Sequence, residues 1–246
     1  MKKDILCLTC LLAAFFAFSA ASLWAQKAET HKSKVGQVTV TMTPPEGMVR
    51  VDGRNARADA FVKAVEPKFK FKVLAIYADK KEWDAFVEAA SKKQPASIPR
   101  YAMIGVPRKM HKKSFDTAKA RKELKSNANW FNLAANNSVT ASLLTSQGNK
   151  KLKEYMGVDI GFKFKTDKFT QVFEETSSSA SAGARVDFKL HGQPSEVYLT
   201  VTPMRVGDKF IYLAYFEKSG TAEQLRAVQA KTGTWRRAVN SLNAGN

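Results

Sequence analysis

The chain has 246 residues, with 40 Lys or Arg against 22 Asp or Glu, and a formal net charge of +18. Its two cysteines, Cys7 and Cys10, both lie in an apolar N-terminal segment, which excludes disulfides, thiol catalysis and thiolate metal sites from the rest of the chain. So basic a chain favours anionic partners, although a solvated lysine-rich surface accounts for the same charge.

The N-terminus has the regions of a secretory signal peptide. Lys2 and Lys3 precede an apolar run that ends in small residues near Ala25. We therefore predict a cleaved signal peptide over residues 1–25 and a periplasmic or secreted bacterial protein. The alternative is an uncleaved membrane anchor. Removing the segment lowers the net charge only from +18 to +17. No later run reaches the roughly twenty apolar residues of a membrane helix, so no further transmembrane span is expected.

The first part of the mature chain predicts two strands and a helix. Residues 26–36 are polar and lysine-bearing, which predicts a flexible lead-in. Residues 37–43 alternate apolar side chains with threonine and predict a strand. A short strand over residues 48–51 follows the turn Pro44-Pro45-Glu46-Gly47, and a helix is predicted over residues 56–65.

The next part alternates strands with helices. Strands are predicted over residues 69–77 and 100–106, the second ended by Pro107, with a helix from residue 79 or 80 to residue 92 between them. Residues 139–154 predict a helix or a loop.

A strand-rich region follows, with strands predicted over residues 156–165, 169–175 and 183–190. The low-complexity run Ser177–Gly183 predicts a mobile loop. The acid pair Glu174-Glu175 beside it is interpreted as solubilising rather than catalytic.

The C-terminal region predicts a hairpin followed by a long helix. A strand over residues 196–202 leads through the turn Gly207-Asp208 to residues 209–217, which are apolar on both faces and predict a central strand. Thr221 and Gln224 resemble a capping box.

The C-terminal helix has one apolar stripe, formed by Leu225, Val228, Trp235, Val239 and Leu242. Arg236 lies largely off this stripe. Gly233 lowers helix propensity by about 1 kcal/mol relative to Ala, so we expect a bend or break there.

The most basic stretch is the candidate binding site. Ser114 is expected to cap a helix that runs through it to about Leu133. The candidate residues are Arg108, Lys109, Lys112, Lys113, Lys119, Arg121, Lys122 and Lys125. Anionic lipid, cell-wall polymer or an envelope protein are the partners considered. Nucleic acid is not expected, because export separates the protein from DNA and most RNA.

No catalytic, cofactor or metal site is predicted. His31, His111 and His191 are far apart and have no metal-ligand partner at helical or strand spacing. The sequence contains no Gly-x-Ser-x-Gly, His-Glu-x-x-His, Walker or Gly-x-Gly-x-x-Gly motif. Active sites also assemble from residues distant in sequence, so the absence of these motifs does not decide against an enzyme.

The strand entering Pro44-Pro45-Glu46-Gly47-Met48, together with the closing strands and the Trp235-bearing helix, resembles the PsbP/Mog1-like group. That resemblance implies an antiparallel sheet sandwiched by helices, and members that are mostly binding or assembly factors. We therefore expect one α+β domain over residues 37–246, acting as a non-enzymatic binding or assembly factor of the bacterial envelope. The alternative is a hydrolase acting on an envelope component.

Overall fold

The computed structural model describes residues 30–53, 59, 71–91, 100–136, 142, 145–146, 149–150, 163–165, 167–190, 193–218 and 220–245. The predicted signal peptide lies outside the described residues, as does His191. So do most residues of the segments predicted over residues 56–65, 139–154 and 156–165.

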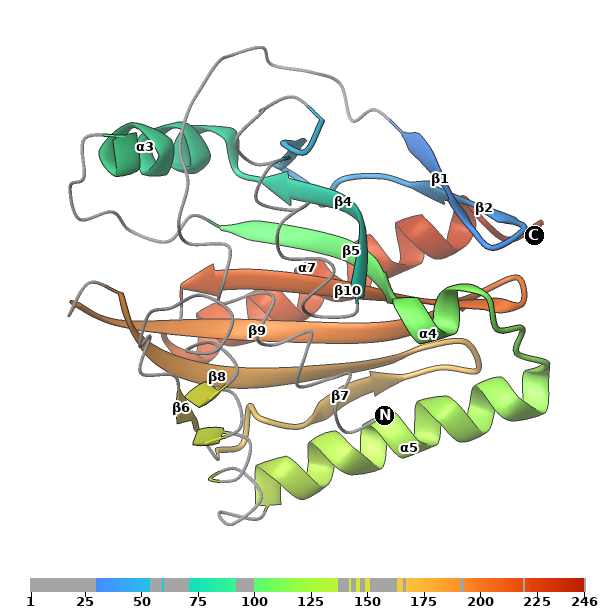
Figure 1. Ribbon diagram of the computed structural model, residues 1–246. Coiled ribbons are helices and arrows are strands. Elements are labelled where there is room, and N and C mark those ends of the chain that lie inside the picture. Colours follow the sequence, from blue (N-terminus) through green and yellow to red (C-terminus); the bar gives the residue numbers. More distant parts are fainter. Residues whose placement is uncertain are drawn as a thin grey trace.

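A large antiparallel sheet forms the centre of the molecule (Figure 1). Its spatial order is β3-β4-β5-β10-β9-β8-β6, and β7 pairs with β8 beside this path. The strands are β3 Val49–Arg50, β4 Phe71–Ala78, β5 Tyr101–Pro107, β6 Lys163–Phe164, β7 Val172–Glu175, β8 Ala180–Leu190, β9 Gln193–Val206 and β10 Lys209–Lys218. The predicted class, α+β with an antiparallel sheet flanked by helices, is confirmed.

The β9–β10 hairpin lies in the middle of this sheet. Gly207 turns the chain with a φ of 57°, in the left-handed region that glycine enters without steric cost. Strand β10 pairs with β9 on one side and β5 on the other, and Lys209 to Phe216 are all buried. The prediction of a central strand is therefore confirmed, and the structure shows that both of its faces are buried.

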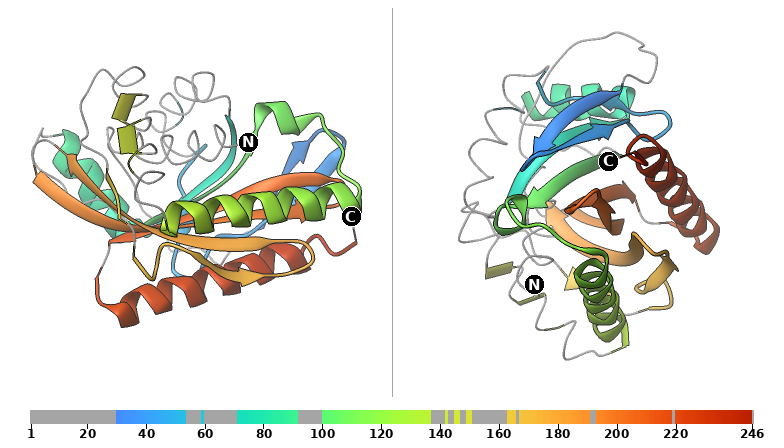
Figure 2. Two further views of the ribbon diagram at one scale, coloured as in Figure 1. Left: turned by 90° about the horizontal axis from the view of Figure 1, so that it is seen from below. Right: turned by 90° about the vertical axis from the view of Figure 1, so that its right-hand side faces the viewer.

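Helices cover the two faces of the sheet, and Figure 2 shows α5 (Thr117–Asn136) and α7 (Ala222–Ser241) on opposite sides of it. On the α7 face, Trp235 packs edge-on against Tyr77 with ring centroids 6.1 Å apart. On the other face, Phe115 packs edge-on against Phe210 at 4.9 Å. Two further helices are α3 (Lys80–Ser91) and α4 (Arg108–His111).

A separate two-stranded sheet is formed by β1 (His31–Val35) and β2 (Val38–Met42). The structure differs here from the predicted flexible lead-in over residues 26–36. Val35, Val40 and Met42 are fully buried, so the hairpin is held by packing that its polar sequence does not reveal.

The serine-rich run predicted to be a mobile loop is largely strand. Ser179 bridges to Met204, and the chain from Ala180 to Gly183 belongs to β8 and is buried. Small residues are required because neighbouring groups approach closely. A Cβ on Gly183 would lie 1.9 Å from the Tyr198 hydroxyl.

The C-terminal helix departs from prediction at three positions. The capping box of Thr221 and Gln224 is confirmed, but α7 continues through Gly233 to Ser241 without a break. Gly233 is buried, and a Cβ there would lie 3.1 Å from Glu174 Oε2, so glycine admits a close neighbour. Leu242 follows the end of the helix and is 41% exposed, so its assignment to the buried stripe is wrong. Arg236 is buried instead.

Candidate functional site

The basic surface consists of the eight predicted cations, which lie on α4, the following loop and the first half of α5. Figure 1 shows α4 leading through this loop into α5. All eight side chains are exposed: Arg108, Lys109, Lys112, Lys113, Lys119, Arg121, Lys122 and Lys125. The structure therefore places all eight predicted residues on accessible surface along residues 108–125.

Apolar residues within the same stretch fix it to the sheet. Met110 is buried, and its sulfur accepts a hydrogen bond from the Tyr212 hydroxyl at 3.9 Å. Phe115 packs on Phe210, and its backbone N–H donates to Asp208 O at 2.8 Å. The exposed cations are thus carried by backbone that is anchored on both sides of the loop.

Helix α5 begins later than predicted and has a different cap. Its first residue is Thr117, and Asp116 Oδ1 accepts a hydrogen bond from the Lys119 backbone N–H at 2.8 Å. Asp116 stands immediately before the first helical residue and satisfies an N–H of the first turn. The prediction that Ser114 caps the helix is wrong. The Ser114 hydroxyl accepts from Lys209 Nζ instead, at 3.0 Å.

The orientation of α5 leaves its cations in solvent. Ala120, Leu124 and Ala128 recur at four-residue spacing and are buried, and the helix lies against β8 and β9. The apolar stripe is therefore occupied by the protein's own sheet.

Two carboxylates near the basic surface are already engaged. Hydrogen bonds from the Lys119 backbone and side chain lower the pKa of Asp116. A hydrogen bond with the Ser114 hydroxyl, together with Lys209, lowers the pKa of Asp208. Both carboxylates are held in their charged form and partly offset the cations around them.

Lysines from distant parts of the chain join this region, and sequence reasoning did not find them. Lys72 Nζ lies 3.2 Å from His111 Nε2 and 3.4 Å from Lys34 O. Lys34 lies on β1 and Lys72 on β4, so only the tertiary fold brings them beside α4. We call Lys34, Lys72, His111 and Lys112 the histidine cluster.

Lys209 is the one member of this region whose ammonium is withdrawn from solvent. Its side chain is 5% exposed. Its Nζ donates to Lys113 O and Ser114 Oγ, both at 3.0 Å, and lies 3.2 Å from Asp208 Oδ2. Three partners use the three donors of an ammonium group, so Lys209 acts as a fixed charge beneath the loop.

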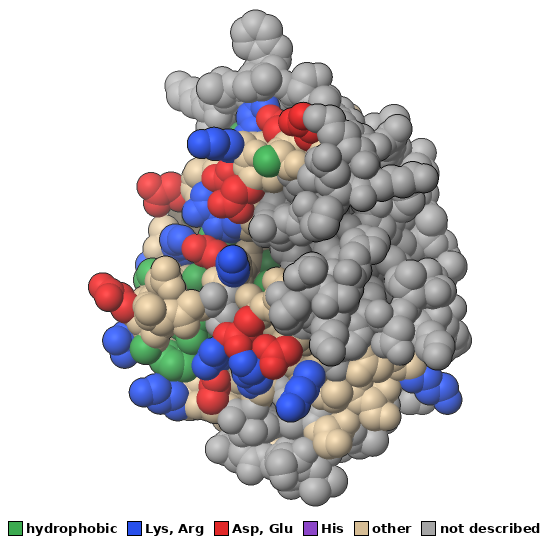
Figure 3. All heavy atoms as spheres, turned by 90° about the vertical axis from the view of Figure 1, so that its left-hand side faces the viewer, with side chains coloured by type: hydrophobic (Ala, Val, Ile, Leu, Met, Phe, Trp, Pro, Cys, Tyr) green, Lys and Arg blue, Asp and Glu red, His purple; other side chains and the backbone are tan. Residues whose placement is uncertain are grey.

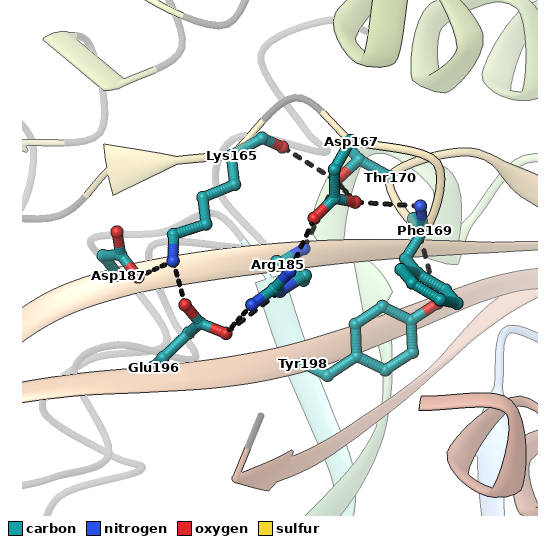
Figure 4. Close-up of polar contacts among 8 residues, drawn as sticks. All are labelled: Lys165, Asp167, Phe169, Thr170, Arg185, Asp187, Glu196 and Tyr198. Carbon is teal, nitrogen blue, oxygen red and sulfur yellow. Dashed lines mark hydrogen bonds and ion pairs between the residues drawn. The ribbon is translucent and has the colours of Figure 1, made fainter. Parts of the chain in front are cut away.

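A different face of the molecule has charges of both signs. Figure 3 shows Lys and Arg interspersed with Asp and Glu on the left-hand side of the view in Figure 1. One network, drawn in Figure 4, joins two cations to three carboxylates from β8, β9 and the chain before β7: Lys165, Arg185, Asp167, Asp187 and Glu196.

Each cation of this network has two carboxylate partners. Arg185 contacts Glu196 and lies 3.0 Å from Asp167, while Lys165 contacts Glu196 and lies 3.1 Å from Asp187. Hydrogen bonds to Glu196 raise the pKa of both Lys165 and Arg185. Three carboxylates exceed two cations, so the network keeps a small negative charge and does not attract an anionic partner.

Tyr198 lies beside the network, as Figure 4 shows. Its hydroxyl donates to Phe169 O at 3.1 Å and accepts from Gln229 Nε2 at 2.7 Å. Burial raises the pKa of Tyr198 to about 12, so the hydroxyl stays protonated at neutral pH. These contacts tie α7 and the chain before β7 to the centre of the sheet.

The two described histidines differ in their hydrogen-bond partners. His31 Nε2 lies 3.0 Å from the Tyr77 hydroxyl, and burial followed by Arg50 lowers its pKa to about 4. His111 contacts Lys72. Within the part of the chain that the structure describes, no group of three His, Cys, Asp or Glu side chains is placed to hold a metal ion.

Comparisons with known proteins give only a weak resemblance of fold. No protein-family model matches the chain, and a search of the curated proteins found no match. The Ran-binding protein Mog1p of Saccharomyces cerevisiae is similar, with 11% identity, a TM-score of 0.29, and coverage of 83% of this chain and 85% of that chain. A singly substituted variant of protein Mog1 has 12% identity, a TM-score of 0.30, and coverage of 82% and 84%. At these values the likeness carries no information about function.

Among the described helices, none combines the length and the apolar character needed to cross a bilayer.

Proposed function

We propose that this protein is a non-enzymatic binding or assembly factor of the bacterial envelope that uses the basic surface to bind an anionic partner. The observation that carries the proposal is the exposure of all eight cations over one anchored segment. Clustered charges of one sign raise the local concentration of counter-charged partners and speed their association.

The binding is electrostatic rather than insertive. Amphipathic helices that enter the bilayer boundary present an unoccupied apolar face. In the part of α5 that carries the cations, Ala120, Leu124 and Ala128 are buried against the protein's own sheet, and the exposed apolar residue Leu133 lies beyond them. Attraction between exposed charges is screened by salt, with a Debye length of about 10 Å at 0.1 M and about 3 Å at 1 M.

Binding to vesicles tests the proposal. Purified protein is mixed with phosphatidylglycerol vesicles and with uncharged phosphatidylcholine vesicles at low and high salt. We expect binding to the anionic vesicles only, and at least a tenfold loss of affinity between 0.05 and 0.5 M salt. Binding that does not change with salt, or that is equal on both vesicles, overturns the proposal.

A matched pair of variants locates the binding surface. The first replaces Lys112, Lys119, Arg121 and Lys122 with Gln, and the control replaces four exposed cations elsewhere, Lys168, Lys218, Arg226 and Arg237. Both variants lose the same net charge. We expect the first variant to bind the anionic vesicles at least tenfold more weakly than the control. Equal losses of affinity in the two variants would show that overall charge determines binding and that this surface does not.

The envelope location rests on the signal sequence and has its own test. Protein isolated from a bacterial envelope fraction should begin at Gln26 by N-terminal sequencing. A cytoplasmic protein that retains Met1 would contradict the location.

A further inference from the structure

The histidine cluster has a geometry that the other cations of the basic surface lack. Lys34 comes from β1, Lys72 from β4, and His111 and Lys112 from the end of α4. Lys72 Nζ lies 3.2 Å from His111 Nε2, and Lys34 O is a hydrogen-bond partner of both side chains. Three elements therefore hold an ammonium and an imidazole in direct contact.

The charges that act on His111 are all positive. They are Lys72, Lys112 and Lys209. Lys209 is committed to Lys113 O, Ser114 Oγ and Asp208, and the Asp208 carboxylate is engaged by the same ammonium and by Ser114. Lys112 is exposed and Lys72 is half-buried, while Lys34 contributes its backbone carbonyl. An anion placed here would lie close to several cations. Asp208, the carboxylate in this group, is already held by Lys209 and Ser114.

We propose that Lys72 and His111, flanked by Lys112, form a subsite for a phosphate group of the anionic partner. The inference rests on the proposed function and names the chemistry that the basic surface recognises. Phosphate supplies several acceptor oxygens and about two negative charges near neutral pH, which matches an ammonium–imidazole pair better than a singly charged carboxylate does.

Phosphate binding is coupled to protonation of His111. In the unliganded protein, burial and then Lys72 lower the pKa of His111, so the neutral ring accepts a hydrogen bond from Lys72. A bound dianion favours the charged ring and raises this pKa. Binding of the dianion therefore takes up a proton and becomes tighter as the pH falls through the raised pKa, until the phosphate itself is protonated to the monoanion at about pH 6. Above the raised pKa this gain is lost.

The first test follows the imidazole of His111 by NMR, using inorganic phosphate as the probe. We expect its pKa to rise by at least 0.5 unit in saturating phosphate, relative to sodium chloride of the same ionic strength. The rise should be lost in Lys72→Gln and retained in the control Lys168→Gln. An equal pKa in phosphate and chloride overturns the subsite.

The second test distinguishes a lipid headgroup from free phosphate. Vesicles of phosphatidic acid carry a phosphate monoester, whereas phosphatidylglycerol carries a diester with one charge. For a lipid headgroup we expect His111→Gln to reduce binding to phosphatidic acid about threefold to tenfold at pH 7 and to reduce binding to phosphatidylglycerol less than about twofold. A response of His111 to inorganic phosphate, without this loss on vesicles, assigns the subsite to free phosphate.

The two proposals fail separately. Salt-sensitive vesicle binding without any phosphate effect on His111 overturns the subsite and retains the proposed function. Phosphate-dependent protonation of His111 without any binding to anionic vesicles overturns membrane binding by the basic surface and retains the subsite. Thermal unfolding of His111→Gln and Lys72→Gln is the folding control. Both variants should unfold cooperatively near the temperature of the wild type, so that a lost response to phosphate or phosphatidic acid reflects lost binding.

Discussion

Two adjacent arginines on α7 differ in burial and in partners. The Arg236 side chain is 8% exposed and donates to Ser179 Oγ at 3.0 Å and to Glu174 Oε1 at 2.6 Å. The Arg237 side chain is 62% exposed and lies 3.9 Å from the same carboxylate. Glu174, interpreted from the sequence as a solubilising residue, therefore joins β7 to α7.

Replacing each arginine with alanine should distinguish the stability contribution of the buried ion pair of Arg236 from that of the exposed ion pair of Arg237. We expect Arg236→Ala to lower the free energy of unfolding by about 2–4 kcal/mol, because it removes two hydrogen bonds and leaves Glu174 without its closest cation. Arg237→Ala should cost less than about 0.5 kcal/mol. Urea denaturation measures both changes, and similar losses for the two variants would contradict the assigned role of Arg236.

His31 makes stability depend on pH. Its pKa is lowered to about 4 by burial and by Arg50, against about 6.5 in an unfolded chain. The folded state thus resists protonation, so stability is fully present above pH 6.5 and falls as the pH drops toward 4. His31 is partly exposed, so we expect a loss of about 1 kcal/mol at pH 4.5. His31→Asn should flatten this slope, and an unchanged pH profile would show that other groups cause it.

At the scale of elements, side chains of the C-terminal segment hold the β1–β2 hairpin. Asn243 Nδ2 donates to Thr41 O at 2.7 Å, and Asn243 Oδ1 accepts from the Thr41 backbone N–H at 2.8 Å. Trp235 Nε1 donates to Thr43 O at 2.7 Å. The amide of Asn243 pairs with β2 as a neighbouring strand would, so the hairpin is fixed although it belongs to a separate sheet.

Removal of this pairing should loosen the hairpin before the rest of the fold. We expect Asn243→Ala to lower the free energy of unfolding by about 1–3 kcal/mol and to speed hydrogen exchange at the Thr41 amide. Asn240→Ala, at an exposed position of α7, is the control and should leave that amide protected. Equal exchange at Thr41 in both variants would mean that other packing holds the hairpin.

The elements that could be predicted are those specified by neighbouring residues. The β9–β10 turn, the central strand and the cap of α7 follow from Gly207, from alternation and from the Thr221–Gln224 pair. The β1 strand could not be predicted, because its polar residues give little periodicity. Its distant contacts, such as Tyr77 with His31 and Lys72 with the Lys34 carbonyl, form only in the folded chain.

The same distinction applies to the candidate site. Its eight cations form one run and were visible in the sequence. Lys34 and Lys72 were not, because they reach His111 only through the pairing of β4 with β5 and the packing of the hairpin. A run of lysines and arginines can be recognised in the sequence. The contact between Lys72 and His111 cannot, because the two residues come together only in the folded chain.

At the scale of the whole molecule, charge and packing are divided between regions. Ion pairs engage the charged side chains of the face that carries Arg185 and Glu196, while the basic surface is held by buried Met110 and Phe115 and keeps its cations in solvent. The central sheet is covered by α5 on one face and by α7 on the other. Binding at the basic surface therefore depends on a core that only the two helices complete.

Truncation before Thr221 tests that dependence. It removes α7 and uncovers Tyr77, Leu213 and Tyr215, which lie on the face that α7 covers and are fully or almost fully buried. A contiguous apolar face of this kind promotes aggregation, so we expect an insoluble product. A chain that ends at Ala244 loses only terminal residues beyond the helix and should fold and bind as the full chain does. Solubility and a cooperative unfolding transition are the measurements. A soluble truncation that unfolds cooperatively would show that the sheet is stable without α7 and that the core lies mainly on the α5 face.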